Sequence, residues 1–77
     1  MIKLLVSINL AVNRQRYYRI AVEPTLLGPV CVTRIYGRLG GKEKRMAPIE
    51  CESEDQALRL AQRLIKKRIK RGYCEHH

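Results

Sequence analysis

The first ten residues alternate between apolar and polar side chains, which is typical of a β-strand with one buried face. The apolar positions of this segment are Ile2, Leu4, Val6, Ile8 and Leu10. Lys3, Ser7 and Asn9 occupy the other side, where Leu5 breaks the polar pattern. We therefore expect a strand over 2–10 whose apolar positions face the core, with partial cover of the other side at Leu5.

A second strand is expected over 16–23, after a polar turn at 13–15. This segment is rich in aromatic and β-branched residues, and its alternation places Tyr18, Ile20 and Val22 on one face. The two strands can pair as a hairpin. Pro24 should end the second strand, because proline lacks the N–H that a strand ladder requires.

A third strand is expected over 30–39, after a loop that reaches Pro29. It leads into a pair of glycines, Gly40 and Gly41, which permit a sharp turn. Residues 42–49 can then return as a fourth strand. The glycine-rich turn fits neither of the common nucleotide-binding spacings and no helix opens after it, so it is better explained as a hairpin turn.

From Ser53 the apolar period changes to that of a helix. Ser53 and Gln56 form a capping box, and two acidic residues between them complement the positive end of the helix dipole. The apolar stripe consists of Ala57, Leu58, Leu60, Ala61, Leu64, Ile65 and Ile69. Gly72 is the expected residue just beyond the helix. The stripe predicts that the helix packs on the sheet, which is the largest single burial available to so small a domain.

Together these elements predict an α+β fold, in which an antiparallel sheet of about four strands carries one C-terminal helix. A chain of 77 residues has room for one modest core, so we expect a single domain over 1–77 with its core in 2–73. The core must be built from Leu, Ile and Val, because the chain contains no Phe and no Trp.

The net charge of +9 and the pI of about 10.0 are extreme for this length and indicate an anionic partner. Nucleic acid is the leading candidate. An anionic membrane surface, an acidic protein or a basic surface kept for solubility would also satisfy the charge. A membrane partner is disfavoured, because the apolar stripe of the helix is needed for the core.

The three cysteines are far apart and form neither a disulfide framework nor a zinc-ligand spacing. We interpret them as reduced thiols of a cytoplasmic protein, with Cys31 and Cys51 packed as small hydrophobic residues. The apolar segment near the amino end is too short to span a bilayer and lacks a cleavage pattern, so export is not expected. His76 and His77, native or part of a tag, are not expected to bind metal.

The candidate site lies around Tyr36. Strand alternation places Tyr36 between Arg34 and Arg38 on one face, and a ring between guanidinium groups suits a stacking platform beside a phosphate-binding surface. A half-exposed strand whose tyrosine fills a groove is the alternative. The predicted nucleic-acid-binding residues are Tyr36, Arg34, Arg38, Lys42, Lys44 and Arg45, extended by Arg63, Lys66, Lys67 and Lys70 on the helix.

No catalytic arrangement can be assembled from this sequence. The acidic residues fall mostly in loops or at the helix cap, and both histidines lie at the end of the chain. We therefore expect a protein that is not an enzyme, with no cofactor and no metal site.

The segment Tyr36-Gly37-Arg38-Leu39-Gly40, the strand around Tyr17-Tyr18-Arg19-Ile20, the capped helix and its Arg71-Gly72-Tyr73 ending resemble the WGR domain. This module occurs in poly(ADP-ribose) polymerases and in short stand-alone bacterial proteins. The resemblance implies an antiparallel sheet with one helix and a role in nucleic-acid binding. It also implies that Tyr36 takes the place of the motif Trp, which stacks at a DNA end, and Arg38 that of the motif Arg.

Tyr offers a smaller π-face than Trp, so stacking would persist in weaker form. The first hypothesis is thus a non-catalytic nucleic-acid-binding module, for DNA in preference to RNA and with little sequence preference. The second is an adaptor that docks on an acidic protein through the same surface, because the motif Arg of the family also contacts neighbouring domains.

Overall fold

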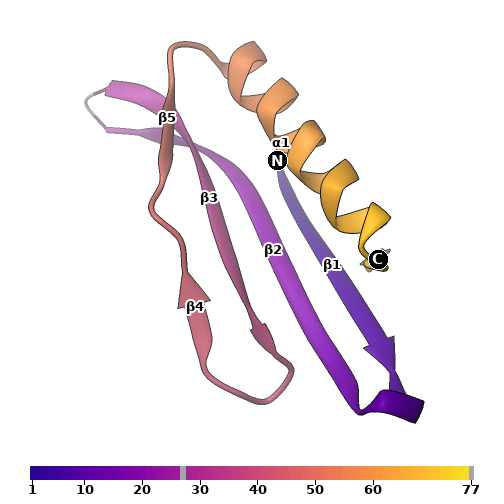
Figure 1. Ribbon diagram of the computed structural model, residues 1–77. Helices are drawn as coiled ribbons and strands as arrows, with labels where there is room; N and C mark the ends of the chain where they lie inside the picture. The colour runs from indigo at the N-terminus through magenta and orange to yellow at the C-terminus, as the bar shows by residue number, and fades with distance from the viewer. Residues whose placement is uncertain (27, 77) are drawn as a thin grey trace.

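The computed structural model describes residues 1–26 and 28–76 of the chain. The elements in chain order are β1 (Ile2–Asn9), η1 (Leu10–Val12), β2 (Arg14–Thr25), β3 (Gly28–Arg38), β4 (Glu43–Arg45), β5 (Ile49–Cys51), α1 (Glu54–Lys70) and β6 (Cys74–His76). The fold is α+β, as predicted. Figure 1 shows β2 and β3 as the longest strands, with α1 crossing beside the sheet.

The sheet is antiparallel throughout and has six strands in the described part of the chain, in the order β4-β3-β2-β1-β6. β5 also pairs with β3, so that β4 and β5 lie one after the other along the same edge. The prediction of about four strands treated 42–49 as one strand. The ladder is interrupted there at 46–48, where Pro48 has no N–H to donate.

The predicted hairpin of the first two strands is present, and β2 pairs with β3 over most of its length. Pro24 does not end β2 as predicted. It pairs with Val30, and the strand register shifts between Pro24 and Thr25, which is the kind of irregularity that accommodates proline in a ladder. The predicted loop up to Pro29 is correspondingly shorter, because β3 already begins at Gly28; Leu27 lies outside the described residues.

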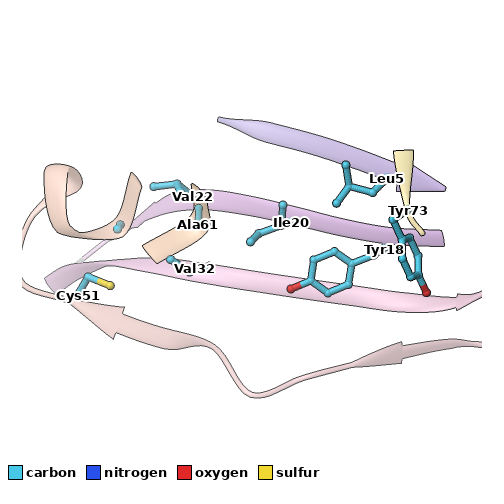
Figure 2. Packing of buried hydrophobic residues seen from close by; sticks show 9 residues of the cluster. Leu5, Tyr18, Ile20, Val22, Val32, Cys51, Ala61 and Tyr73 are labelled. Carbon is cyan, nitrogen blue, oxygen red and sulfur yellow. The ribbon is translucent and has the colours of Figure 1, made fainter. Parts of the chain in front are cut away.

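Helix α1 packs against β2, β3 and β5 and covers one face of the sheet. The buried cluster beneath it includes Tyr18, Ile20 and Val22, the face predicted for the second strand. Figure 2 shows Cys51 at one end of this cluster and the rings of Tyr18 and Tyr73 at the other.

The prediction for the first strand was wrong about which face is buried. Leu5 and Ser7 face α1 and are 0% and 4% exposed, whereas Ile2 and Ile8 are 60% and 57% exposed. The pairing explains the reversal, since Leu5 lies opposite Tyr18, whose side chain points to the helix. The second face of the sheet carries no helix, so the alternating apolar row of β1 is left half-buried or exposed.

Both ends of α1 follow the capping signals in the sequence. The Gln56 N–H donates to the Ser53 hydroxyl at 3.1 Å, and the Gln56 side-chain carbonyl accepts from the Glu52 N–H at 2.7 Å. At the other end Gly72 has φ +98°, and the N–H groups of Gly72 and Tyr73 donate to the carbonyls of Ile69 and Arg68. These two bonds form a Schellman motif, which turns Tyr73 back toward the sheet.

The apolar stripe of the helix is buried as predicted at Ala57 and Ala61, and half-buried at Leu58, Leu60, Leu64 and Ile65. Ile69 is an exception at 49% exposed. Arg68, one residue earlier, continues the spacing of Ala57, Ala61 and Leu64 and lies over the Tyr18 ring, so Ile69 falls at the edge of the buried stripe. Cys31 and Cys51 are buried, as expected, and Cys74 is exposed.

Candidate nucleic-acid interface

Strand pairing brings an aromatic row and a cationic row together on the helix-covered face. Tyr36 lies directly opposite Tyr18 on β2 and Lys44 on β4. In the next row toward the β1–β2 turn, Arg38 lies opposite Arg16. Because side chains two residues apart share a face, all five point to the side of the sheet on which α1 lies.

A groove of about 400 Å³ lies where these rows meet the carboxyl end of the helix. It is lined by Arg16, Tyr36, Gly37, Arg38, Lys42, Lys44, Arg68 and Tyr73. Five of these residues are cations and two are tyrosines, and none of the lining residues is acidic. The sheet supplies the floor, the β3–β4 turn supplies one wall and the last turn of α1 supplies the other.

Gly37 permits the β3–β4 turn to close on the groove. A Cβ at this position would lie 2.8 Å from the main-chain oxygen of Lys42, closer than real Cβ contacts, and 3.4 Å from the Tyr17 ring. Only glycine allows this approach without a shift of backbone. The glycine between Tyr36 and Arg38 therefore allows the strand that carries Lys44 to return close to β3.

Arg68 is held by three rings at the end of α1. Its guanidinium carbon lies 4.3 Å from the centroid of the Tyr18 ring, 5.5 Å from that of Tyr73 and 6.0 Å from that of Tyr36. These are cation–π distances. Tyr18 is 1% and Tyr73 is 8% exposed, so the cation rests on the rings that close this end of the core.

The electrostatic balance of the site is positive. Burial raises the pKa of the Tyr18 phenol above its ordinary value of 10.0, although Arg34 and Arg68 oppose this shift by favouring the phenolate. The phenol therefore stays neutral at physiological pH and cannot balance the nearby cations. Among the residues that the structure describes, the carboxylates in ion pairs lie elsewhere, Glu75 with Lys3 and Glu43 with Arg45.

The cationic surface continues from the groove around the end of the sheet. A neighbouring hollow is lined by Ser7, Arg14, Arg16, Arg68, Arg71 and Tyr73. A third hollow, at the β1–β2 turn, shares Arg14, Arg16 and Arg38 with these two. We refer to Arg14, Arg16, Arg38, Arg68 and Arg71 as the arginine rim.

Comparison with known proteins places the chain in a family. The model of the WGR domain matches residues 1–77, the whole length. The chain belongs to the WGR domain family. WGR domains are modules of the nucleic-acid-binding type rather than catalytic domains, and the resemblance seen in the sequence is thereby confirmed.

One relative of this WGR domain is an uncharacterized protein, y4dW, from Sinorhizobium fredii (strain NBRC 101917 / NGR234). The two are 41% identical over 61 residues, which cover 79% of the present chain and 29% of the relative. The chain thus spans less than a third of the length of that protein. No solved structure gives a significant match.

Four of the site residues predicted from sequence meet in the groove, namely Tyr36, Arg38, Lys42 and Lys44. Arg34 shares their face but lies one row away, half-buried, where its Nη2 donates to the Ala47 carbonyl at 3.5 Å. Its buried Nε has no hydrogen-bond partner. Arg34 therefore lies near the Tyr18 phenol and is not among the residues that line the groove.

Arg45 lies on the opposite face of the sheet. It pairs with Ile35 across the ladder and forms an exposed ion pair with Glu43 at 3.3 Å. Alternation along β4 explains why it separates from Lys44, since successive residues point to opposite faces. The interpretation of 42–45 as one continuous cationic rim did not apply this rule to the returning strand.

The predicted helix cations do not line the groove either. Arg63 and Lys66 border a separate surface hollow on the solvent side of α1, together with Gln56, Arg59 and Gln62. Lys67 and Lys70 are exposed. These residues add to the positive field of the WGR domain, but they form a second surface.

Sequence reasoning missed Arg16, Arg68, Arg71, Arg14 and Tyr73 as site residues. Arg16 was detectable, because alternation from Tyr18 places it on the same face, beside Arg38 if the strands pair in register. Arg68 was harder to find, because it continues the spacing of the buried helix positions and only the structure shows three rings beneath it.

Within the described residues, no helix of this WGR domain has both the length and the apolar character needed to cross a membrane. Over the same part of the chain, no group of three or more His, Cys, Asp or Glu residues could hold a metal ion.

Proposed function

We propose that this WGR domain is a non-catalytic module that binds nucleic acid, with DNA as the expected partner, through the groove around Tyr36 and the arginine rim. The single observation that carries the proposal is the composition of the groove walls. Five cations and two phenol rings line about 400 Å³ with no carboxylate among them. Such a combination favours a ligand that has both anionic groups and flat rings.

Each class of side chain has a distinct role in this proposal. Arg16, Arg38 and Arg68 can donate paired N–H groups to phosphate oxygens, because the guanidinium fork matches that geometry. Lys42 and Lys44 supply compact positive charge from the β3–β4 turn. Tyr36 is half-buried and lines the groove. It can therefore stack on a base or a sugar while the rest of its side chain stays packed against the core.

Little sequence preference is expected. The lining residues are cations and phenols, which contact phosphates and the faces of bases. Reading base edges in duplex DNA relies on side chains such as Asn, Gln or Arg presented on an element that enters the major groove. The groove is instead a recess between a helix end and a hairpin, and it is suited to the backbone of a strand.

Fluorescence anisotropy tests the proposal with blunt duplex, nicked duplex, single-stranded DNA and RNA, each at several salt concentrations. If the five groove cations neutralise about five phosphates, log K against log salt should fall with a slope of about −4.5 on duplex DNA. A slope near zero would refute the proposal. Tyr36→Ala should weaken binding by about 1–3 kcal/mol where a base stacks on the ring.

The chain provides a matched control for charge. Arg38→Ala should weaken binding to all of the nucleic acids and reduce the salt slope by about 1. Arg19→Ala removes the same charge from an exposed position on β2, one residue from Tyr18 and therefore on the opposite face. Equal losses for the two variants would mean that net charge, and not the groove, is responsible for binding.

An acidic protein is the second candidate partner. The groove cations would pair with carboxylates as well as with phosphates. A pull-down from nuclease-treated lysate separates the two functions. A partner that is retained after nuclease treatment and lost in Arg38→Ala would favour the adaptor.

A further inference from the structure

The position of Arg68 differs from that of the other groove cations. The other groove cations are exposed residues of the sheet or of the β3–β4 turn, namely Arg16, Arg38, Lys42 and Lys44. Arg68 is half-buried, lies over the Tyr18 ring and reaches two other rings within 6.0 Å. Both of the hollows that flank this point, the groove and its neighbour beside Ser7, include Arg68 and Tyr73 in their walls.

We propose that Arg68 is a positioning residue, which clamps the Tyr36 and Tyr73 rings at the groove and holds its own guanidinium ready for a phosphate diester. The inference rests on the proposed function, because it assigns the nucleic-acid backbone as the ligand. A positive charge alone at position 68 is insufficient for full binding affinity. The planar guanidinium itself is required.

The geometry supplies the reason. The guanidinium of Arg68 lies over the Tyr18 ring, and its planar fork carries paired N–H donors at a point that borders both the groove and the neighbouring hollow. Tyr18 is 1% exposed, so the ring beneath the cation is enclosed by the core. An ammonium group in the same place would keep the charge, but it would lose the planar guanidinium and its paired donors.

Main-chain hydrogen bonds at the end of α1 also hold Arg68 close to Tyr73. The Arg68 carbonyl accepts the N–H groups of Arg71 and Tyr73, both at 3.0 Å, within the motif that ends the helix. Tyr73 is thus tied to Arg68 by a main-chain bond and by a ring contact of 5.5 Å. Tyr36 reaches Arg68 across the groove from β3 at 6.0 Å. The rings of Tyr18 on β2, Tyr36 on β3 and Tyr73 after α1 therefore converge on one side chain.

A purely structural role for Arg68 makes a different prediction. If the side chain only fills the end of the core, its apolar stem is what matters, and Arg68→Met should preserve the groove. If it only supplies charge, Arg68→Lys should bind nucleic acid as the wild type does. The proposed clamp requires that both variants fail.

The experiment compares Arg68→Lys and Arg68→Met with Arg38→Lys, a change of the same chemistry at an exposed groove position. Binding to single-stranded and duplex DNA is measured against salt. We expect Arg68→Lys to bind at least tenfold more weakly with an unchanged salt slope, Arg68→Met to lose affinity and part of the slope, and Arg38→Lys to remain within about threefold. Arg68→Lys behaving like Arg38→Lys would overturn the proposal.

A second measurement needs no nucleic acid. The chain contains four Tyr, no Trp and no Phe, so the near-ultraviolet circular dichroism reports on tyrosine rings. Arg68→Lys and Arg68→Met should lose much of this signal while the far-ultraviolet spectrum and the cooperative unfolding transition stay intact. An unchanged near-ultraviolet spectrum would refute the clamp even where binding falls. If the wild type binds none of the nucleic acids, the proposed function fails, and this spectrum still decides whether the clamp exists.

Discussion

The face that β1 turns toward the helix can be tested by a pair of truncations of similar size. Leu5→Ala and Ile8→Ala each remove three carbons from strand β1, but Leu5 is 0% exposed and Ile8 is 57% exposed. At about 0.8 kcal/mol per buried methylene, Leu5→Ala should lose about 2.4 kcal/mol from transfer alone. The cavity left against Tyr18 raises the expected loss to about 3–5 kcal/mol.

For Ile8→Ala the same reasoning predicts a loss of about 1 kcal/mol or less, because less than half of the side chain is covered. Urea denaturation followed by far-ultraviolet circular dichroism gives the unfolding free energy of each variant. A domain of this length is stable by only roughly 4–12 kcal/mol, so Leu5→Val, at about 1 kcal/mol, extends the series if Leu5→Ala is unfolded. Equal losses at the two positions, or a larger loss at Ile8, would refute the register of β1.

Three further outcomes follow from the structure. Gly37→Ala should lower the free energy of unfolding by about 1–3 kcal/mol and weaken nucleic-acid binding, because its Cβ would lie 2.8 Å from the Lys42 carbonyl oxygen. Gly28→Ala, whose nearest Cβ contact would be 3.5 Å, is the control in both the denaturation and the anisotropy measurements. Gly72→Ala should cost about 1 kcal/mol because φ is +98°, whereas Gly41→Ala, which has no positive φ, should cost less in the same denaturation assay. Burial raises the pKa of Tyr18 in the folded protein above that in the unfolded chain. The free energy of unfolding should therefore keep its full value below about pH 10 and fall as the pH rises through the pKa of the folded protein. An absorbance titration should show one phenol that ionises after the others.

The elements of this fold could be predicted because each has a strong local signal. The aromatic and β-branched residues of β2, the glycine pair after β3 and the capping box at Ser53 specify a hairpin, a turn and a helix start without reference to the rest of the chain. The helix end was equally local, since Gly72 adopts the positive φ that its position suggested.

The buried face of β1 could not be predicted in the same way. Alternation shows that a strand has two different faces, but only the position of the helix decides which face is covered. Here Leu5 and Ser7 lie on the helix-covered face, and the more apolar row of β1 faces the side without a helix. The hydrophobic pattern therefore indicated the wrong face of β1, because the register with β2 places Leu5 opposite the buried Tyr18.

The candidate site was found in part for the same physical reason. Tyr36 and Arg38 belong to one strand, so alternation was sufficient to place them together. Lys44 and Arg45 are adjacent on a returning strand, where alternation separates them and sends Arg45 to the ion pair with Glu43. Arg16 and Arg68 come from other elements, and their approach to Tyr36 depends on strand register and on the angle of the helix.

Arg68 also shows how this domain divides its helix between stability and binding. Ala57, Ala61, Leu64 and Arg68 follow the spacing of one buried stripe, and the first three pack on the sheet. A leucine at position 68 would extend the core by one more turn, whereas Arg68 places a cation over three rings there. The tyrosines at this end of the core therefore serve two purposes, because the rings that exclude water from Leu5 and Ile20 also orient a guanidinium toward the groove. A WGR domain with an apolar residue at this position would be expected to gain stability and to lose the preorganised donor, so the groove and the core cannot be optimised independently.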